Sequence, residues 1–203
     1  MRTYLAPLVC GCLLAPGAAS ANDRDDALTV IDKAIQAQGG ADALANVRTA
    51  VRSGDGVLYQ GGMEVPFTDQ MTLDLPDRWR DAVEIDKKVQ FTIAVGGDKG
   101  WQSSVGTVSD LGPERLKELR EEIYVLWLET LLPLKKDDFE LAPLPEAKVN
   151  DRPAAGVKVS DKGHADVSLF FDKQTHLLVK VERTAEEAGL RLPKEYLLAD
   201  YKE

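Results

Sequence analysis

The chain has 203 residues, enough for one domain with a hydrophobic core, and its patterning gives no reason to divide it. It contains 34 acidic and 25 basic residues, a net charge of −9. Phosphate backbones and anionic membrane surfaces would repel such a chain, so nucleic acid is not expected as a partner.

Residues 1–21 have the pattern of an export signal. Arg2 supplies an early positive charge, residues 4–19 form an apolar run, and Ala19-Ser20-Ala21 fits a small-residue cleavage site. Cleavage would leave residues 22–203 as a single mature domain. We therefore expect an exported protein of the periplasm or cell envelope.

A membrane anchor is the alternative interpretation of this segment. Pro7 and Pro16 interrupt the run, which is shorter than the roughly 20 apolar residues that span a bilayer. No stable membrane span is therefore expected. Cys10 and Cys12 also lie in the segment, so the mature chain would have no disulfide and would depend on packing for its stability.

A helix is predicted after the signal and ends at Gly39-Gly40. Residues 22–26 form a polar leader that could cap it, and residues 41–47 are predicted to add a short helical turn. The positions that recur at helical spacing are Leu28, Ile31, Ala34, Ile35 and Gln38.

From residue 49 the period changes to two, which predicts consecutive antiparallel strands with one apolar face. Gly61-Gly62, Pro76-Asp77 and the run from Gly96 to Gly100 mark the turns, and Trp101 opens a further strand. The alternating apolar positions are Val51, Val57, Tyr59, Met63, Val65, Phe67, Met71, Leu73, Leu75, Trp79, Val83, Ile85, Val89, Phe91, Ile93 and Val95.

A long helix is predicted over residues 113–132, with Pro113 in its first turn and Pro133 ending it. Its apolar stripe comprises Leu116, Leu119, Ile123, Trp127 and Leu131. Residues 123–128 are apolar nearly all round, so this half of the helix is expected to be enclosed on several sides.

Strand patterns resume at residues 139–141, 155–159, 167–171, 177–181 and 196–201. The order of helix, strands, helix, strands indicates an α+β fold in which one long helix covers a wide antiparallel sheet. Such a helix can leave a groove for an apolar ligand. The alternative is a sealed core that Trp79, Trp101 and Trp127 simply fill.

No catalytic, metal or cofactor motif is recognised. His164 and His176 lie in or beside predicted turns without metal-spaced partners, so both are interpreted as turn residues. The mature chain has no cysteine nucleophile and no phosphate-binding loop. The acidic pairs at 121–122, 137–138 and 186–187 are interpreted as solvated surface. We therefore expect a protein that is not an enzyme and needs no cofactor.

Two motifs resemble those of the periplasmic lipoprotein-carrier family, the LolA-like proteins. The first is residues 75–80, Leu-Pro-Asp-Arg-Trp-Arg, followed about twenty positions later by residues 96–101, Gly-Gly-Asp-Lys-Gly-Trp. The second is the hairpin from Phe171 to Lys180, in which the family usually has glycine where this chain has His176. The resemblance extends from about residue 27 to residue 201.

The resemblance implies a curved antiparallel half-barrel, closed by a long apolar helix and an N-terminal helix, with a cavity for acyl chains of lipoproteins or lipids. Two features depart from the family. The order Asp98-Lys99-Gly100 reverses the last two residues of the usual Asp-Gly-Lys turn. Family members also commonly continue through further strands, so the last strand here would be a bare edge or the chain would be truncated.

The function hypothesis is a non-enzymatic carrier or chaperone of acyl chains in lipoprotein sorting and transport. Arg78 and Arg80 alternate with Trp79 and should lie on the opposite face. The alternative is a closed-core module, an interaction or sensor domain, that binds another envelope protein through the last strand. The expected cavity walls are Phe67, Met71, Trp79, Phe91, Ile93, Trp101, Leu116, Leu119, Ile123 and Trp127.

Overall fold

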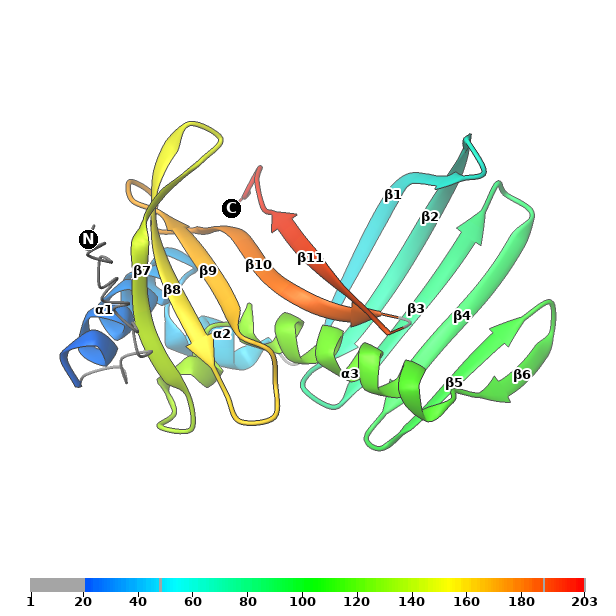
Figure 1. Cartoon of the computed structure of the whole chain (residues 1–203), viewed down its shortest axis with the longest axis horizontal. Helices are drawn as coiled ribbons and strands as arrows, with labels where there is room; N and C mark the ends of the chain where they lie inside the picture. The colour runs from blue at the N-terminus through cyan, green and yellow to red at the C-terminus, as the bar shows by residue number, and fades with distance from the viewer. Residues whose placement is uncertain (1–20, 48, 188, 203) are drawn as a thin grey trace, which may run out of the picture.

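The computed structural model describes residues 21–47, 49–187 and 189–202, which form two antiparallel sheets and a small number of helices (Figure 1). The predicted export signal lies outside the described residues except for Ala21. Within the described part, no helix is long and apolar enough to cross a membrane. The α+β class is confirmed, but the single wide sheet expected from the sequence is not, because the strands divide into two sheets.

The first sheet is a meander of six strands that pair in chain order. Its turns fall where glycine permits a positive φ, as at Gly61 and Gly62 between the first two strands. The strands are β1 (Ala50–Gln60), β2 (Met63–Asp74), β3 (Arg78–Ile85), β4 (Val89–Gly96), β5 (Lys99–Ser104) and β6 (Thr107–Asp110).

Strands β2 to β4 present their odd-numbered residues on one face, as the alternation predicts. Leu73, Trp79 and Val95 are buried there and lie opposite one another in register. Strand β1 is different: its register places Arg52 opposite Met71, so its own odd-numbered apolar residues lie on the other face. Val51, Val57 and Tyr59 are exposed there, which corrects their expected placement on the apolar face.

The second sheet has the order β11-β10-β9-β8-β7. The final strand starts six residues earlier than predicted, because Gly189, at φ 77°, closes a hairpin directly after β10. The sequence signal for this strand is weak, since Leu190 and Leu192 are exposed and Pro193 lies within it. The strands are β7 (Glu140–Val149), β8 (Arg152–Ser160), β9 (Val167–Asp172), β10 (Leu178–Glu187) and β11 (Leu190–Leu197).

Helix α1 (Ala21–Ala37) packs against β7, and α2 (Ala41–Asn46) follows the glycine pair that ends it. The predicted polar leader is part of α1, and its Arg24 donates hydrogen bonds to the carbonyl oxygens of Lys136 and Phe139. The buried face of α1 comprises Ala27, Ile31, Ala34 and Ile35.

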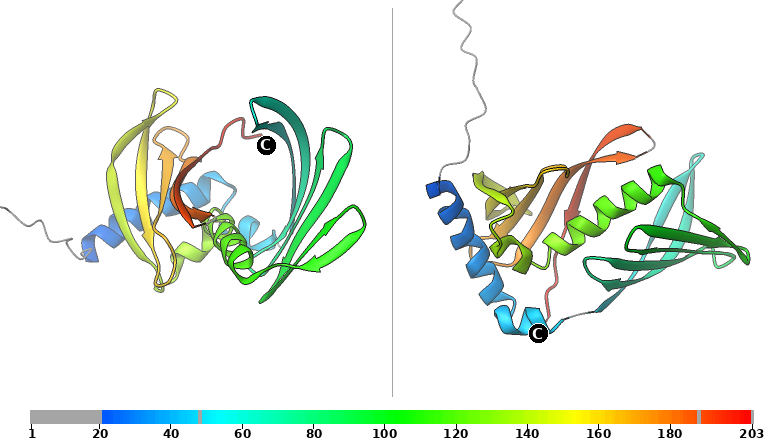
Figure 2. Two further views of the ribbon diagram at one scale, coloured as in Figure 1. Left: turned by 45° about the vertical axis from the view of Figure 1, so that its right-hand side comes forward. Right: turned by 90° about the horizontal axis from the view of Figure 1, so that it is seen from below.

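Helix α3 (Pro113–Leu128) runs between the two sheets, and Figure 2 shows it beside the concave side of the first sheet. It ends four residues before the predicted end, because Leu131 adopts φ 65° and a short 3-10 helix, η1 (Leu132–Lys135), follows. The expected enclosure of residues 123–128 is confirmed, since each of them is buried or half-buried.

Helix α3 contributes to two separate hydrophobic clusters. Tyr124, Val125 and Leu128 pack into the cluster between α1 and the second sheet. Leu119 and Ile123 pack into the cluster on the first sheet. The two sheets are therefore joined through the side chains of one helix.

Candidate functional site

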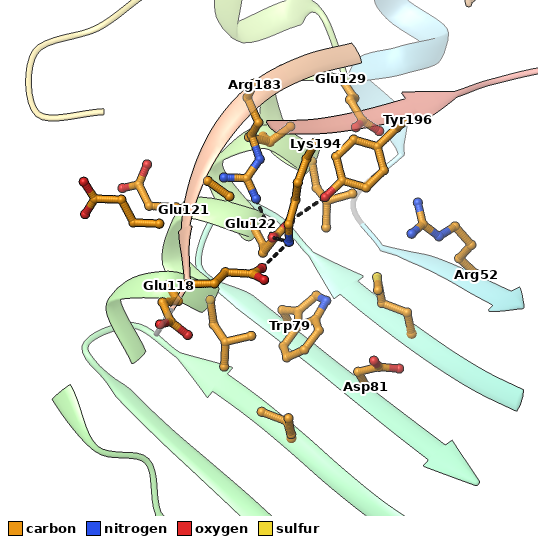
Figure 3. Close-up of a pocket in the computed structure, with 18 of the residues that line it drawn as sticks. Arg52, Trp79, Asp81, Glu118, Glu121, Glu122, Glu129, Arg183, Lys194 and Tyr196 are labelled. Carbon is orange, nitrogen blue, oxygen red and sulfur yellow. Dashed lines mark hydrogen bonds and ion pairs between the residues drawn. The ribbon is translucent and has the colours of Figure 1, made fainter. Parts of the chain in front are cut away.

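A cavity of about 730 Å³ lies between the inner face of the first sheet, α3 and the hairpin of β10 and β11 (Figure 3). One side of its wall is apolar and comes from β2, β3, β4 and α3. A second side carries charged groups from α3, β10 and β11. The apolar lining comprises Met71, Trp79, Val83, Phe91, Ile93, Leu119, Val125, Leu126, Ala185, Leu197 and Leu198.

A network of charged side chains centres on Glu122 of α3. The side chain of Arg183 is only 3% exposed and its guanidinium pairs with the Glu122 carboxylate. Lys194 Nζ donates to Glu122 Oε1 at 2.7 Å, and the Tyr196 hydroxyl donates to Glu122 Oε2 at 3.1 Å. Burial raises the pKa of Glu122, but the hydrogen bonds and charges of Lys194 and Arg183 outweigh it and hold that pKa below its ordinary value.

Strand register explains why these groups converge. Arg183 on β10 lies directly opposite Lys194 on β11, so both side chains leave the same face of the hairpin. Tyr196 lies two residues beyond Lys194 and therefore points to the same side. That face meets the third turn of α3, where Glu122 accepts hydrogen bonds from Lys194 and Tyr196 and forms an ion pair with Arg183.

Two further carboxyl groups line the cavity near Arg52. Burial raises the pKa of Glu129 to about 7, against a smaller opposing effect of the Arg52 charge. Burial also raises the pKa of Asp81, and the Asp69 charge adds to this effect. Both acids therefore hold their protons at a higher pH than exposed carboxyls do.

The structure brings five of the ten sequence-predicted residues together around this cavity: Met71, Trp79, Phe91, Ile93 and Leu119. Phe67 lies on the same sheet face but outside the cavity lining, with its ring over Gly56, where an added Cβ would lie 2.7 Å from the ring. Whether any of them contacts a ligand stays a prediction.

The structure places the other four predicted residues elsewhere. Leu116, Ile123 and Trp127 line a different hollow of about 740 Å³ that also includes Val95 and His164. Trp101 pairs with Ala94 in register and therefore lies on the opposite face of the first sheet, 39% exposed. Arg80 pairs with Thr72 on that outer face, as its alternation with Trp79 predicted.

The charged part of the lining differs from the sequence prediction. Glu121 and Glu122, which are expected on the solvated surface, both line the cavity. Two signals were available: Arg183 occupies an inward position between Val181 and Ala185 of β10, and Asp81 occupies one between Trp79 and Val83 of β3. A charged residue at an inward strand position needs a partner or a cavity.

One of the two histidines lies in a turn, and the other stacks on an aromatic ring. His176 has φ 61° in the turn between β9 and β10, which confirms its interpretation as a turn residue. His164 stacks on Tyr124 with ring centroids 3.7 Å apart, and its Nδ1 lies 3.0 Å from Glu121. Among the described residues, no group of three or more His, Cys, Asp or Glu could hold a metal ion.

Comparison with solved structures identifies the fold. The chain matches a domain from Vibrio parahaemolyticus provisionally assigned to outer membrane lipoprotein sorting, with a TM-score of 0.54 and 16% identity over 89% of this chain and 80% of that chain. It also matches a DUF1329 family protein from Desulfovibrio piger, with a TM-score of 0.50 and 11% identity over 79% and 74%. A LolA superfamily protein from Nitrosomonas europaea gives a TM-score of 0.49 and 14% identity over 87% and 79%.

No protein-family model matches the sequence, and no curated protein matches it. The chain thus shares its fold with the Vibrio parahaemolyticus and Desulfovibrio piger structures. At identities of 11% to 16% these likenesses concern the fold alone.

Proposed function

We propose that this protein is a non-enzymatic carrier of acyl chains, from lipids or lipoproteins, that acts in the cell envelope after export. The observation that carries the proposal is the cavity between the first sheet and α3. Its apolar wall is supplied by the alternating strands, and its volume falls in the range of about 300–1,000 Å³ typical of ligand pockets. In this proposal α3 and α1 close the open side of the sheets.

An acyl chain could be held by this wall without specific polar contacts. Each methylene group removed from water contributes about 0.8 kcal/mol, so a long chain gains several kcal/mol from burial alone. Met71 adds an adaptable surface because its side chain is flexible and polarisable. The name of the Vibrio parahaemolyticus domain, which refers to lipoprotein sorting, and the predicted signal at residues 1–21 support the same function and location.

Native mass spectrometry of residues 22–203, purified from an envelope fraction without detergent, tests the proposal. We expect a stoichiometric lipid or acyl adduct that solvent extraction releases for identification. Phe91→Glu places a charge in the apolar wall and should abolish the adduct, whereas Thr92→Glu, on the outer face of the same strand, should retain it. A clean apo mass that also resists added fatty acid would contradict the carrier proposal.

A second candidate function is binding of an extended segment of another envelope protein. It is favoured by β11, which is an edge strand of the second sheet and leaves Leu190, Leu192 and Leu197 exposed. An edge strand offers unpaired backbone groups to a partner strand. An apo protein whose association with an envelope extract is lost on Leu192→Lys would support this candidate over the carrier.

A further inference from the structure

Two polar atoms that β3 contributes to the cavity wall lack a hydrogen-bond partner among the described residues. Trp79 Nε1 and Asp81 Oδ1 are both inaccessible to solvent, and neither has a hydrogen-bond partner among the described residues. Trp79 as a whole is only 7% exposed. The two residues lie two apart on β3, so their side chains leave the same face of the strand and both line the cavity (Figure 3).

These two atoms have opposite hydrogen-bonding roles. The indole Nε1–H can only donate, and a carboxylate oxygen accepts. Their neighbours in the sheet cannot serve them, because Leu73 and Val95 flank Trp79 while Met71 and Ile93 flank Asp81. A purely hydrocarbon ligand would leave both atoms unpaired, whereas a ligand with a matching polar end would gain a hydrogen bond to each of them.

The charge of the lining restricts the ligand further. Eight acidic and four basic side chains line the cavity. Arg183 and Lys194 pair with Glu122, and Arg115 pairs with Glu118. Arg52 lies near Asp81, but the acidic side chains outnumber the basic ones by two to one, so the net field of the lining disfavours a carboxylate or phosphate.

We propose that the cavity selects an acyl ligand with a neutral polar end that both accepts and donates a hydrogen bond, as a hydroxyl or an amide does. In the complex, Trp79 Nε1–H donates to the oxygen of this group, and Asp81 Oδ1 accepts from its O–H or N–H. The inference rests on the proposed carrier function and adds the chemical class of the ligand. The hydroxyl of a glycerol ester and the amide of an N-acylated chain share this chemistry.

A series of ligands with one C18 chain separates the head groups. Oleyl alcohol and oleamide both donate and accept, methyl oleate only accepts, and oleate is an anion. Each would displace the neutral fluorescent probe N-phenyl-1-naphthylamine from residues 22–203. We expect the alcohol and the amide to bind about tenfold more tightly than the ester and the anion. Whichever of the two is preferred then distinguishes a hydroxyl source from an amide source.

Two substitutions in the cavity test which protein atoms produce the head-group selectivity. Asp81→Leu removes the acceptor, so the advantage of oleyl alcohol over methyl oleate should fall from about tenfold to about one. Trp79→Phe keeps an aromatic ring but removes the N–H donor. It should therefore weaken the binding of oleyl alcohol and of methyl oleate by a similar factor. Glu84→Leu on the outer face of β3 is the control and should keep the wild-type ratio.

The results separate this inference from the function on which it rests. Equal binding of all four ligands, or tightest binding of oleate, would overturn the head-group selection and leave the carrier intact. No displacement by any of the four would overturn the carrier function and the inference with it. If folded Asp81→Leu kept the wild-type ratio of affinities for oleyl alcohol and methyl oleate, Asp81 would not bind the head group.

Discussion

Lys194 on β11 donates a hydrogen bond of 2.7 Å to Glu122 on α3, which ties the edge strand of the second sheet to the helix beside the cavity. Arg183 of the neighbouring strand pairs with the same carboxylate oxygen, and its side chain is almost fully buried. Glu122 therefore neutralises a guanidinium that has little access to water. Among the ion pairs of this corner, Glu122 is the one that provides the buried guanidinium of Arg183 with a counterion.

Glu122→Gln should lower the free energy of unfolding by about 1–3 kcal/mol, because it leaves the Arg183 charge buried without a counterion. Urea unfolding followed by tryptophan fluorescence measures the change. Glu140→Gln, at an exposed position on β7, is the matched control and should alter stability by less than about 0.5 kcal/mol. Equal effects of the two substitutions would show that the network contributes nothing.

The same carboxylate predicts a loss of stability in acid. The pKa of Glu122 is held below its ordinary value of 4.5 in the folded protein, so its contribution is fully present above pH 4.5. It is lost as the pH falls below 4.5 through the lower pKa of the folded state. Unfolding measured between pH 6 and pH 3 should therefore show a shallower decline for Glu122→Gln than for the wild type.

Glu129 predicts a pH effect of opposite sign in a different window. Its pKa is about 7 in the folded protein against 4.5 for the ordinary group, so the unfolded chain releases this proton first as the pH rises. Stability should decrease from pH 4.5 to about 7 and then level off, by on the order of 2 kcal/mol. The decline should be smaller in Glu129→Gln, which should exceed the wild type in stability at pH 8.

Urea unfolding at pH 5 and pH 8 checks this effect in both proteins. Glu140→Gln again serves as the control and should keep the full wild-type decline. A wild-type protein that is equally stable at both values, with no gain in Glu129→Gln at pH 8, would contradict a raised pKa at Glu129.

Asp172 organises the turn between β9 and β10. Its Oδ1 accepts from the Thr175 amide at 2.7 Å and the Gln174 amide at 3.0 Å, and Oδ2 lies 2.8 Å from Arg152 Nε. Asp172→Ala should cost about 2 kcal/mol of stability, since it removes these bonds from a side chain that is only 3% exposed. Asp172→Asn, which keeps an acceptor oxygen, should cost less, and thermal unfolding of both variants tests this order.

His176 in the same turn has φ 61°, a conformation that glycine adopts without a steric penalty. The residue in this hairpin of LolA-like proteins is usually glycine. His176→Gly should therefore raise the free energy of unfolding by about 0.5–1 kcal/mol. His164→Gly, which removes the ring stacked on Tyr124, should lower it, and a lower stability of His176→Gly would refute the backbone argument.

The strands β2 to β4 could be predicted because each is buried on one side only. Their inward residues, such as Leu73, Trp79 and Val95, alternate with exposed polar ones, and that alternation is a local property of the sequence. The prediction failed at Trp101, where the turn after β4 changes the phase of the pattern. Gly100 takes the inward position, against Leu111 and Leu116, and Trp101 faces outward.

The division into two sheets and the charged side of the cavity could not be predicted, because both depend on contacts between distant segments. Nothing near Glu122 in the sequence indicates that Arg183 and Lys194 approach it. The edge strand β11 was misplaced for a related reason: its exposed leucines give no burial pattern to detect.

Helix α3 also determines how the protein should unfold. Its residues Leu119 and Ile123 belong to one hydrophobic cluster, and Val125 and Leu128 belong to the other. Neither sheet can lose its core without exposing the helix that completes the core of its neighbour. The two sheets should therefore melt in a single cooperative transition, and a ligand bound beside α3 would protect both of them from hydrogen exchange together.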